Sequence, residues 1–205
     1  MPARTLILSK NDQHHPLEEL GGRLMAWLAD SDAVEAEESH DAAVLEDLAA
    51  YDLCVLCATM SELTPEQEAS AIQFVRDGGK LVGIHSVTVI DVERTAFTDL
   101  IGGRFTHHSP YHEFPVKVIE PGHPVMAGVE DFSILDELYV LDRAPAGAHV
   151  LATAEWDDVT QPLVYTKDVG AGKVLYNALG HDQAAYDHPD FRTLVLQGID
   201  WILDA

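Results

Sequence analysis

The stretch TPEQEASAIQFVRDGGKLVGIHS, residues 64–86, predicts a helix followed by a buried strand. Thr64 can cap the helix, Pro65 suits its first position, and Gln67 completes a capping box. The pair of glycines that follows is typical of a helix end. Residues 80–85 then form a nearly continuous apolar run, the pattern of a strand that is covered on both faces of a sheet.

The sequence before this stretch shows the same alternation. Residues 5–9 and 53–58 are further apolar strands, and a weaker strand is expected near Val34. Leucine and tryptophan at helical spacing over 17–28 predict a helix, and a short helix is expected around 44–48. Strands separated by helices in this way indicate a parallel sheet with helices on both faces.

The second half of the chain is richer in strands, with turns between them. The expected strands cover 113–119, 149–155, 163–166 and 173–179. A closing helix begins near Asp187-His188-Pro189, and its apolar residues fall on one stripe. Because no repeat, low-complexity tract or linker interrupts the pattern, we expect residues 1–205 to form one domain.

The charge balance narrows the choice of partners. The chain has 12 Lys and Arg against 35 Asp and Glu, a formal net charge of −23. Such a surface repels phosphate backbones and anionic membranes, so we expect no nucleic-acid or membrane partner. It suits either a high-salt cytoplasm or an ordinary acidic protein. The longest apolar runs are well below the ~20 residues of a membrane helix, and the N-terminus carries no pattern of a signal peptide. We therefore expect a cytoplasmic protein.

Cys54 and Cys57 have the spacing of a metal-binding or redox pair. Both lie inside the expected strand 53–58, where residues three apart point to opposite faces. Their sulfur atoms are then too far apart to chelate one ion or to pair readily. Packing in the core is the better interpretation of both cysteines.

Polar residues follow three of the expected strands. Residues 9–15 leave the first strand, His85 and Ser86 leave the strand of the opening stretch, and 180–182 leave a late strand. In open α/β sheets, ligands bind outside the carboxyl ends of the strands. These segments are therefore the first candidates for a site, although His14 and His15 themselves are expected to be exposed loop residues.

Several motifs in sequence order make the chain resemble the trehalose-utilisation (ThuA-like) family. After the segment 78–86 come GGRFTHH at 102–108, PGHPV at 121–125, DELY at 136–139 and GAGKVLYNALGH at 170–181. The resemblance implies a flavodoxin-like α/β fold related to class I glutamine amidotransferases, with a mostly parallel sheet and a strand-rich second half. It also implies a role in sugar or disaccharide metabolism, with oxidised 3-keto sugars among the candidate substrates.

The sequence departs from the amidotransferases at their nucleophile. Those enzymes carry a Gly-x-Cys-x-Gly turn between strand and helix, and this chain has Gly83-Ile-His85-Ser-Val87 in the corresponding place. Histidine replaces the cysteine, and neither Cys54 nor Cys57 can take its place because both belong to the preceding strand. Without a thiolate, glutamine amide transfer is not expected.

The resemblance places a group of polar and aromatic residues together in a pocket. The candidate catalytic residues are His85, Glu137 and His181. The candidate substrate-binding residues are Phe105, His108, Asp136, Tyr139, Asp182 and Ser86. Of the neighbouring carboxylates, Glu137 is expected to point inward, and Asp136 could simply cap an element.

Three interpretations of this group remain open. The histidines and Glu137 could act as a general acid and base on a sugar or polyol. Alternatively His85, His108 and His181 could bind a divalent metal such as zinc, as in a metal-dependent hydrolase. The group could also bind a sugar-like ligand without catalysis, as in a carbohydrate-binding or regulatory protein. An edge strand or an apolar helix face would allow a homodimer, but no feature requires one.

Overall fold

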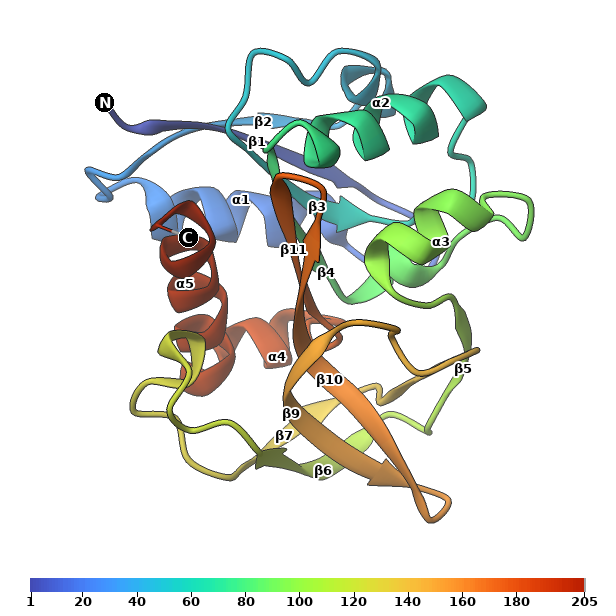
Figure 1. Ribbon diagram of the computed structural model, residues 1–205. Coiled ribbons are helices and arrows are strands. Elements are labelled where there is room, and N and C mark those ends of the chain that lie inside the picture. Colours follow the sequence, from blue (N-terminus) through green and yellow to red (C-terminus); the bar gives the residue numbers. More distant parts are fainter. Residues whose placement is uncertain (205) are drawn as a thin grey trace.

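A computed structural model describes residues 1–204 and contains a nine-stranded sheet that runs through the molecule (Figure 1). Its strand order is β2-β1-β3-β4-β11-β10-β9-β6-β7. The strands are β1 (Ala3–Lys10), β2 (Val34–Ser39), β3 (Leu53–Ala58), β4 (Lys80–Ile84), β6 (His112–Val118), β7 (Phe132–Asp136), β9 (His149–Trp156), β10 (Val159–Val169) and β11 (Gly172–Asn177). A small second sheet pairs β5 (Phe105–His108) with β8 (Tyr139–Leu141).

Helices cover both faces of the sheet, as expected (Figure 1). The α-helices are α1 (Leu17–Leu28), α2 (Pro65–Arg76), α3 (Thr95–Ile101), α4 (Gln183–Asp187) and α5 (Pro189–Asp204), and the 3-10 helices are η1 (Ala42–Glu46), η2 (His85–Thr88) and η3 (Pro124–Met126). Helices α1 and α5 pack on one face, and α2 and α3 pack on the other. The predicted flavodoxin-like α/β class is therefore confirmed.

The sheet changes direction at β11. Strands β2, β1, β3, β4 and β11 are parallel to their neighbours, whereas β10, β9, β6 and β7 continue antiparallel. The expected parallel sheet thus accounts for one half of the final sheet. The tight turn between β10 and β11 causes the change, because strands joined by a short turn pair antiparallel.

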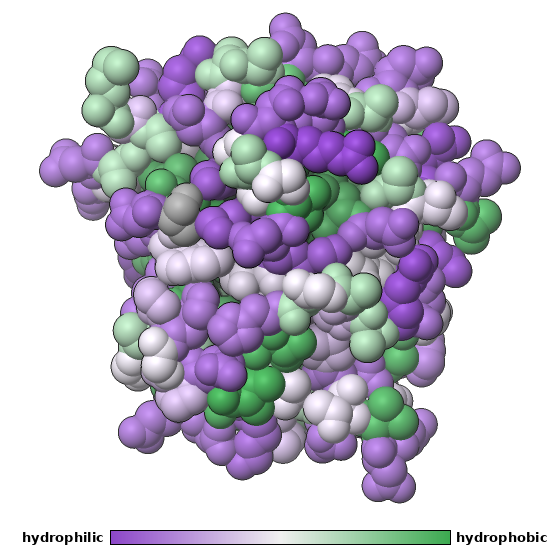
Figure 2. Space-filling model, in the orientation of Figure 1, coloured by the Kyte–Doolittle hydropathy of each residue, from purple (hydrophilic) through white to green (hydrophobic). Residues whose placement is uncertain are grey.

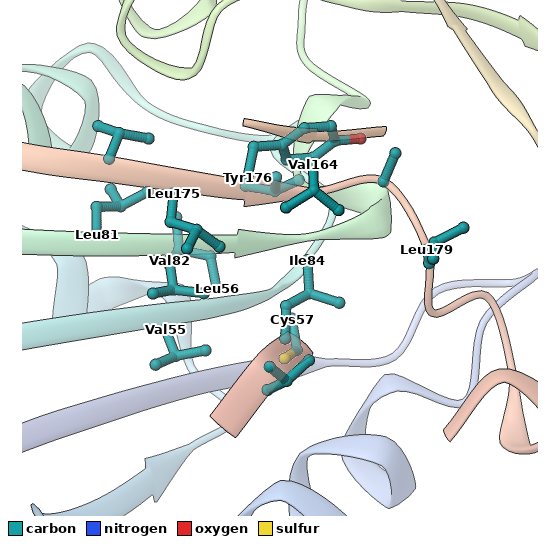
Figure 3. Packing of buried hydrophobic residues seen from close by; sticks show 14 of the residues in the cluster. Val55, Leu56, Cys57, Leu81, Val82, Ile84, Val164, Leu175, Tyr176 and Leu179 are labelled. Carbon is teal, nitrogen blue, oxygen red and sulfur yellow. The ribbon is translucent and has the colours of Figure 1, made fainter. Parts of the chain in front are cut away.

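The stretch that predicts the fold forms the expected elements. Thr64 Oγ1 accepts the Gln67 N–H, and the Gln67 side chain accepts the Thr64 N–H, which completes the capping box of α2. Strand β4 then lies between β3 and β11, with Val82 opposite Val55 on one side and Leu175 on the other. Figure 3 shows these side chains packed across the centre of the sheet.

The four strands expected in the second half are all present as β6, β9, β10 and β11, and β10 is longer than predicted. Strands β5, β7 and β8 and helices α3 and α4 were not predicted. These elements are short, with three to seven residues each. Such short segments carry too few residues for a helical or alternating pattern to stand out.

The outer surface is mainly hydrophilic on the face in Figure 2, in keeping with the excess of Asp and Glu. Within residues 1–204, no helix combines the length and the apolar character needed to cross a bilayer. Cys54 and Cys57 are free and fully buried in β3, as expected. Burial raises the pKa of both thiols to about 12, so neither supplies a thiolate near neutral pH.

The imidazole of His123 caps η3 and so shapes the turn before Pro124. Its Nδ1 accepts the Val125 N–H at 3.2 Å, so the cap needs the neutral ring. Burial and the neighbouring His149 ring lower the pKa of His123, and Glu120 opposes them only in part. Protons therefore bind the unfolded chain in preference to the folded one below the ordinary histidine pKa of about 6.5.

We expect this cap to weaken as the pH falls. The free energy of unfolding should decrease from pH 7.5 to pH 5.5 by more in the wild type than in His123→Asn, because asparagine caps a helix without titrating. Urea unfolding midpoints at both pH values measure the difference. Equal pH dependence in the two proteins would contradict a titrating cap at His123.

Candidate functional site

Three histidines reach one place from the loops that follow three parallel strands. His15 follows β1, His85 follows β4 and His181 follows β11. Glu137 joins them from the connection between β7 and β8. The carboxyl ends of parallel strands lie at one edge of a sheet, which is why segments so far apart in sequence meet here.

The backbone at His85 makes a sharp turn from β4 into η2. His85 has a φ of +45°, a left-handed conformation that is rare for a residue with a side chain. Its carbonyl oxygen accepts the Tyr176 hydroxyl at 3.0 Å, which helps to hold the turn. Gly83 makes the turn possible, since a Cβ there would lie 2.7 Å from a Val87 methyl group. The elbow thus forms although Val87 replaces the second glycine of the amidotransferase turn.

The imidazole of His85 is fully buried and oriented by one hydrogen bond. Its Nδ1 lies 2.7 Å from the Ala178 carbonyl oxygen, which fixes the proton on Nδ1. Nε2 has no hydrogen-bond partner among the described residues and points toward Glu137, 3.8 Å from its Oε2. Burial, with the charge of His15 when protonated, lowers the pKa of His85 well below its ordinary range, so the ring is neutral.

Glu137 is the acidic member of the group, and its side chain is 14% exposed. Its Oε2 lies 3.2 Å from His181 Nδ1, an ion-pair distance, and its Oε1 lies 3.5 Å from His108 Nδ1. Burial alone would lower the pKa of His181, but the Glu137 carboxylate more than offsets this and the net pKa is raised. Burial alone would raise the pKa of Glu137, but the neighbouring His181 lowers this pKa below its ordinary value.

The sequence-based placement of His15 was wrong. The residue is only 7% exposed, and its ring lies 4.9 Å from the His181 ring and 5.4 Å from the His85 ring, measured between centroids. Asp12 holds it there, because Asp12 Oδ2 lies 2.8 Å from His15 Nδ1 and Oδ1 accepts the His15 N–H. The Asp-x-x-His spacing after the first strand was the available signal for this contact.

Asp136 positions the backbone segments that carry Glu137 and His181. Its carboxylate is fully buried and accepts the backbone N–H groups of Glu137, Gly180 and His181 at 2.8, 2.8 and 3.2 Å. Burial raises the pKa of Asp136 to about 7, and the three N–H donors oppose a further rise. Both neighbouring carboxylates therefore point inward, Glu137 to the histidines and Asp136 to the backbone that carries two of the group's residues.

Aromatic rings border the group. Tyr139 lies against His85 with ring centroids 3.9 Å apart, and Phe105 packs on Tyr139 at 4.4 Å. His108 stacks on Phe105 and is 41% exposed. Tyr111, which the sequence did not single out, lies 5.7 Å from the His181 ring. His108 thus lies at the border of the group. His15 occupies the central position that was expected for His108.

Residues 4–202 match the ThuA family, described as trehalose utilisation. This match covers nearly the whole chain. The chain belongs to the ThuA family.

The solved structures most similar in fold include further ThuA-like proteins. One from Parabacteroides merdae has a TM-score of 0.87 and 20% identity, and covers 99% of this chain and 90% of its own. One from Bacteroides uniformis has a TM-score of 0.82 and 19% identity, covering 98% and 91%. A cytoplasmic protein from Salmonella typhimurium LT2 follows at 0.70 and 15%, covering 97% and 99%. At these identities the likeness shows the fold alone.

The same fold occurs inside larger enzymes. A cold-adapted β-galactosidase from Rahnella sp. R3 has a TM-score of 0.67 and 18% identity, and the match covers 98% of this chain but 31% of the galactosidase. No curated protein matches the sequence of the chain. The comparisons therefore establish the ThuA family and its fold, and the chemistry of the site must be argued from its residues.

Two predicted residues of this ThuA protein lie outside the central group. Asp182 caps α4 by accepting the Ala184 and Ala185 N–H groups, and its Oδ2 accepts the Tyr111 hydroxyl at 2.8 Å. Ser86 is fully buried behind the elbow, and its Oγ has no hydrogen-bond partner within residues 1–204. Asp182 thus contacts the border of the site through Tyr111, and Ser86 is a buried residue next to His85 in the elbow.

The centre of the ThuA site is compact. One ligand atom each from His15, His85, Glu137 and His181 lie within 4.8 Å of one another. Such a group can share protons between a carboxylate and an imidazole, or bind a positively charged atom between them. In either case positive charge is concentrated beside a partly exposed carboxylate.

Proposed function

We propose that this ThuA protein is a cytoplasmic enzyme that acts on a sugar carrying a carbonyl group, such as a 3-keto glycoside. The observation that carries the proposal is the contact of Glu137 with three histidines, His181, His108 and His85, at 3.2, 3.5 and 3.8 Å. The family description, trehalose utilisation, supports a sugar as the substrate class. A structural neighbour described as cytoplasmic supports the compartment.

The proposed reaction depends on the negative charge that develops on the carbonyl oxygen of the sugar. A carbonyl oxygen gains negative charge when a neighbouring carbon loses a proton or when water adds to the carbonyl group, and a protonated imidazole nearby stabilises that charge. Glu137 raises the pKa of His181 and so favours its protonated form, which suits His181 to face the oxygen. Glu137 is then suited to remove the proton. His85 stays neutral, and its bond to the Ala178 carbonyl fixes the orientation of its own ring.

A hollow with polar lining is linked to this centre through Asp12. A surface hollow is formed by the loops after β1 and β3, with Lys10, Asn11, Gln13, Thr59 and Ser61 among its polar lining. It also includes Asp12, which binds His15. The hollow lies between strands whose connections leave to opposite faces, the place where open α/β sheets bind ligands. Amide and hydroxyl groups of this kind suit sugar hydroxyls.

Thiolate transfer of an amide is not part of this proposal. The elbow carries His85, and the buried thiols in β3 are protonated near neutral pH. A protein of this fold that binds sugar without catalysis would use the same hollow. The test therefore measures binding and turnover separately.

Incubation with 3-keto glucosides, with trehalose as the unoxidised control, tests the proposal. We expect product by NMR from the keto sugar, and a fall in kcat of about 10²–10⁴-fold in Glu137→Gln, the range for loss of a general acid or base. His107→Ala is the matched control, because His107 is an exposed neighbour of His108 outside the central group. It should retain the wild-type rate.

Two results would overturn the proposal. One is the absence of product from any keto sugar, with or without a rise in melting temperature. A rise without product would favour a binding protein. The other is a wild-type rate in Glu137→Gln.

A further inference from the structure

We propose that His15, His85, His181 and Glu137 form a binding site for one zinc-like divalent cation. The inference rests on the proposed function for its role in catalysis, but the binding itself can be tested without a sugar. It also differs from the sequence-based expectation, since His15 replaces His108 in the ligand set. Three imidazole nitrogens and one carboxylate oxygen suit zinc better than magnesium or calcium, which prefer oxygen ligands.

Two of the histidines present lone pairs to the centre. In each, Nδ1 is engaged elsewhere, by the Ala178 carbonyl for His85 and by the Asp12 carboxylate for His15. These bonds place the proton on Nδ1 and leave the lone pair of Nε2 for a ligand. In His15 that lone pair faces the Tyr139 hydroxyl at 3.4 Å, a long contact that an ion would replace. Nε2 of His85 is fully buried and has no hydrogen-bond partner within the described chain. A buried nitrogen without a partner is costly unless something binds it, and a cation would do so.

The outer contacts have the form found at metal centres. A ligating histidine in a protein usually donates its other N–H to a carboxylate or a backbone carbonyl, which fixes the ring and makes the nitrogen more basic. Asp12 provides the first kind of contact for His15, and Ala178 provides the second for His85. Asp136 fixes the backbone of Glu137 and His181. His15 and His85 thus have a partner for the ring, and Glu137 and His181 have one for the backbone.

The distances leave room for an ion with small adjustments. Ligands about 2.1 Å from a tetrahedral zinc lie about 3.4 Å from one another. Glu137 Oε2 lies 3.2 Å from His181 Nδ1 and 3.8 Å from His85 Nε2, on either side of that value. All four ligand atoms lie within 4.8 Å of one another. Small side-chain rotations would complete the set.

The ion would bind between Glu137 and His181. Nδ1 of His181 lies 3.2 Å from Glu137 Oε2 and makes no well-formed hydrogen bond to a described residue. With the ion bound, His181 would offer its Nδ1 lone pair, since a histidine ligand must be neutral. The cation would polarise a carbonyl oxygen in place of the imidazolium, and Glu137 would bind it through Oε2 and leave Oε1 to take the proton.

Zinc titration of the EDTA-treated full chain tests the site. We expect calorimetry to give one Zn²⁺ per chain, little binding of Mg²⁺, and visible absorption bands of a four- or five-coordinate ion when Co²⁺ is used. His15→Ala should weaken zinc binding at least tenfold. His14→Ala is the matched control, because His14 is the exposed neighbour and bonds only to Gln13 and Asp12 in this loop.

A second variant guards against misfolding. Asp12→Asn retains an oxygen for the backbone N–H groups of His14 and His15 but loses the charge that orients His15. It should fold as the wild type does by circular dichroism and bind zinc about 10–100-fold more weakly, the range for loss of an outer contact. No zinc binding by the wild type, or equal weakening in His14→Ala and His15→Ala, would overturn the site.

The two proposals fail in different ways. Zinc binding without turnover of any keto sugar would remove the proposed function and leave the metal site. Full turnover in the presence of EDTA, with no zinc bound, would remove the metal site and leave an acid–base enzyme.

Discussion

Replacing Asp136 with alanine should lower the free energy of unfolding by about 3 kcal/mol or more and abolish zinc binding. The carboxylate is fully buried, and its removal leaves the N–H groups of Gly180 and His181 without their acceptor. Each buried donor left unpaired costs about 1–3 kcal/mol. The loop after β11 and the connection after β7 then lose the contact that brings His181 to Glu137. Urea unfolding and zinc calorimetry measure the two effects.

Asp182→Ala is the comparison that makes this result specific. Asp182 also accepts two backbone N–H groups, but it does so at the partly exposed start of α4. Loss of such a cap costs about 1 kcal/mol, and zinc affinity should change little because Asp182 contacts no ligand nitrogen in the structure. If Asp136→Ala were as stable as Asp182→Ala and still bound zinc, Asp136 would not be the residue that positions the site.

The residues that were predicted correctly are those whose environment is set by local sequence. The capping box at Thr64, the apolar runs of β1, β3 and β4, and the stripe of α5 all depend on neighbours a few positions away. Pattern and propensity describe such elements well. The small sheet of β5 and β8 was missed because its strands pair across about thirty residues and have few buried positions.

The site was predicted only in part for a related reason. The family resemblance indicated His85, Glu137 and His181. His85 and His181 also follow strands that the pattern located, whereas Glu137 follows β7, which was not predicted. His15 and His108 could not be told apart from sequence, since both lie in polar segments beside a second histidine. The tertiary contacts distinguish them: Asp12 holds His15 in the buried centre, whereas His108 bonds to the neighbouring Ser109 carbonyl and stays at the border.

The second large loss of stability is expected from a substitution in the turn between β10 and β11. Ala171 donates its N–H to the Arg76 carbonyl at 2.9 Å, which fixes the turn to the end of α2. A Cβ at Gly172 would lie 2.1 Å from the Val75 carbonyl oxygen and 2.3 Å from that of Gly79. Both atoms belong to backbone, so neither can rotate away as a side chain could. Gly172 thus packs directly against the end of α2 and the start of β4.

Gly172→Ala should therefore destabilise the fold by about 3 kcal/mol or more, at the upper end of the cost of overpacking. Relief requires α2 or the start of β4 to move away from β11, the strand that leads to His181. Gly122→Ala is the matched control, because nothing lies within 4 Å of a Cβ there, and its effect should stay within about 0.5 kcal/mol. Urea unfolding of both variants measures the two changes in stability. A Gly172→Ala protein within 1 kcal/mol of the wild type would mean that α2 yields easily, and that the close packing of helix and turn contributes little to the position of the site.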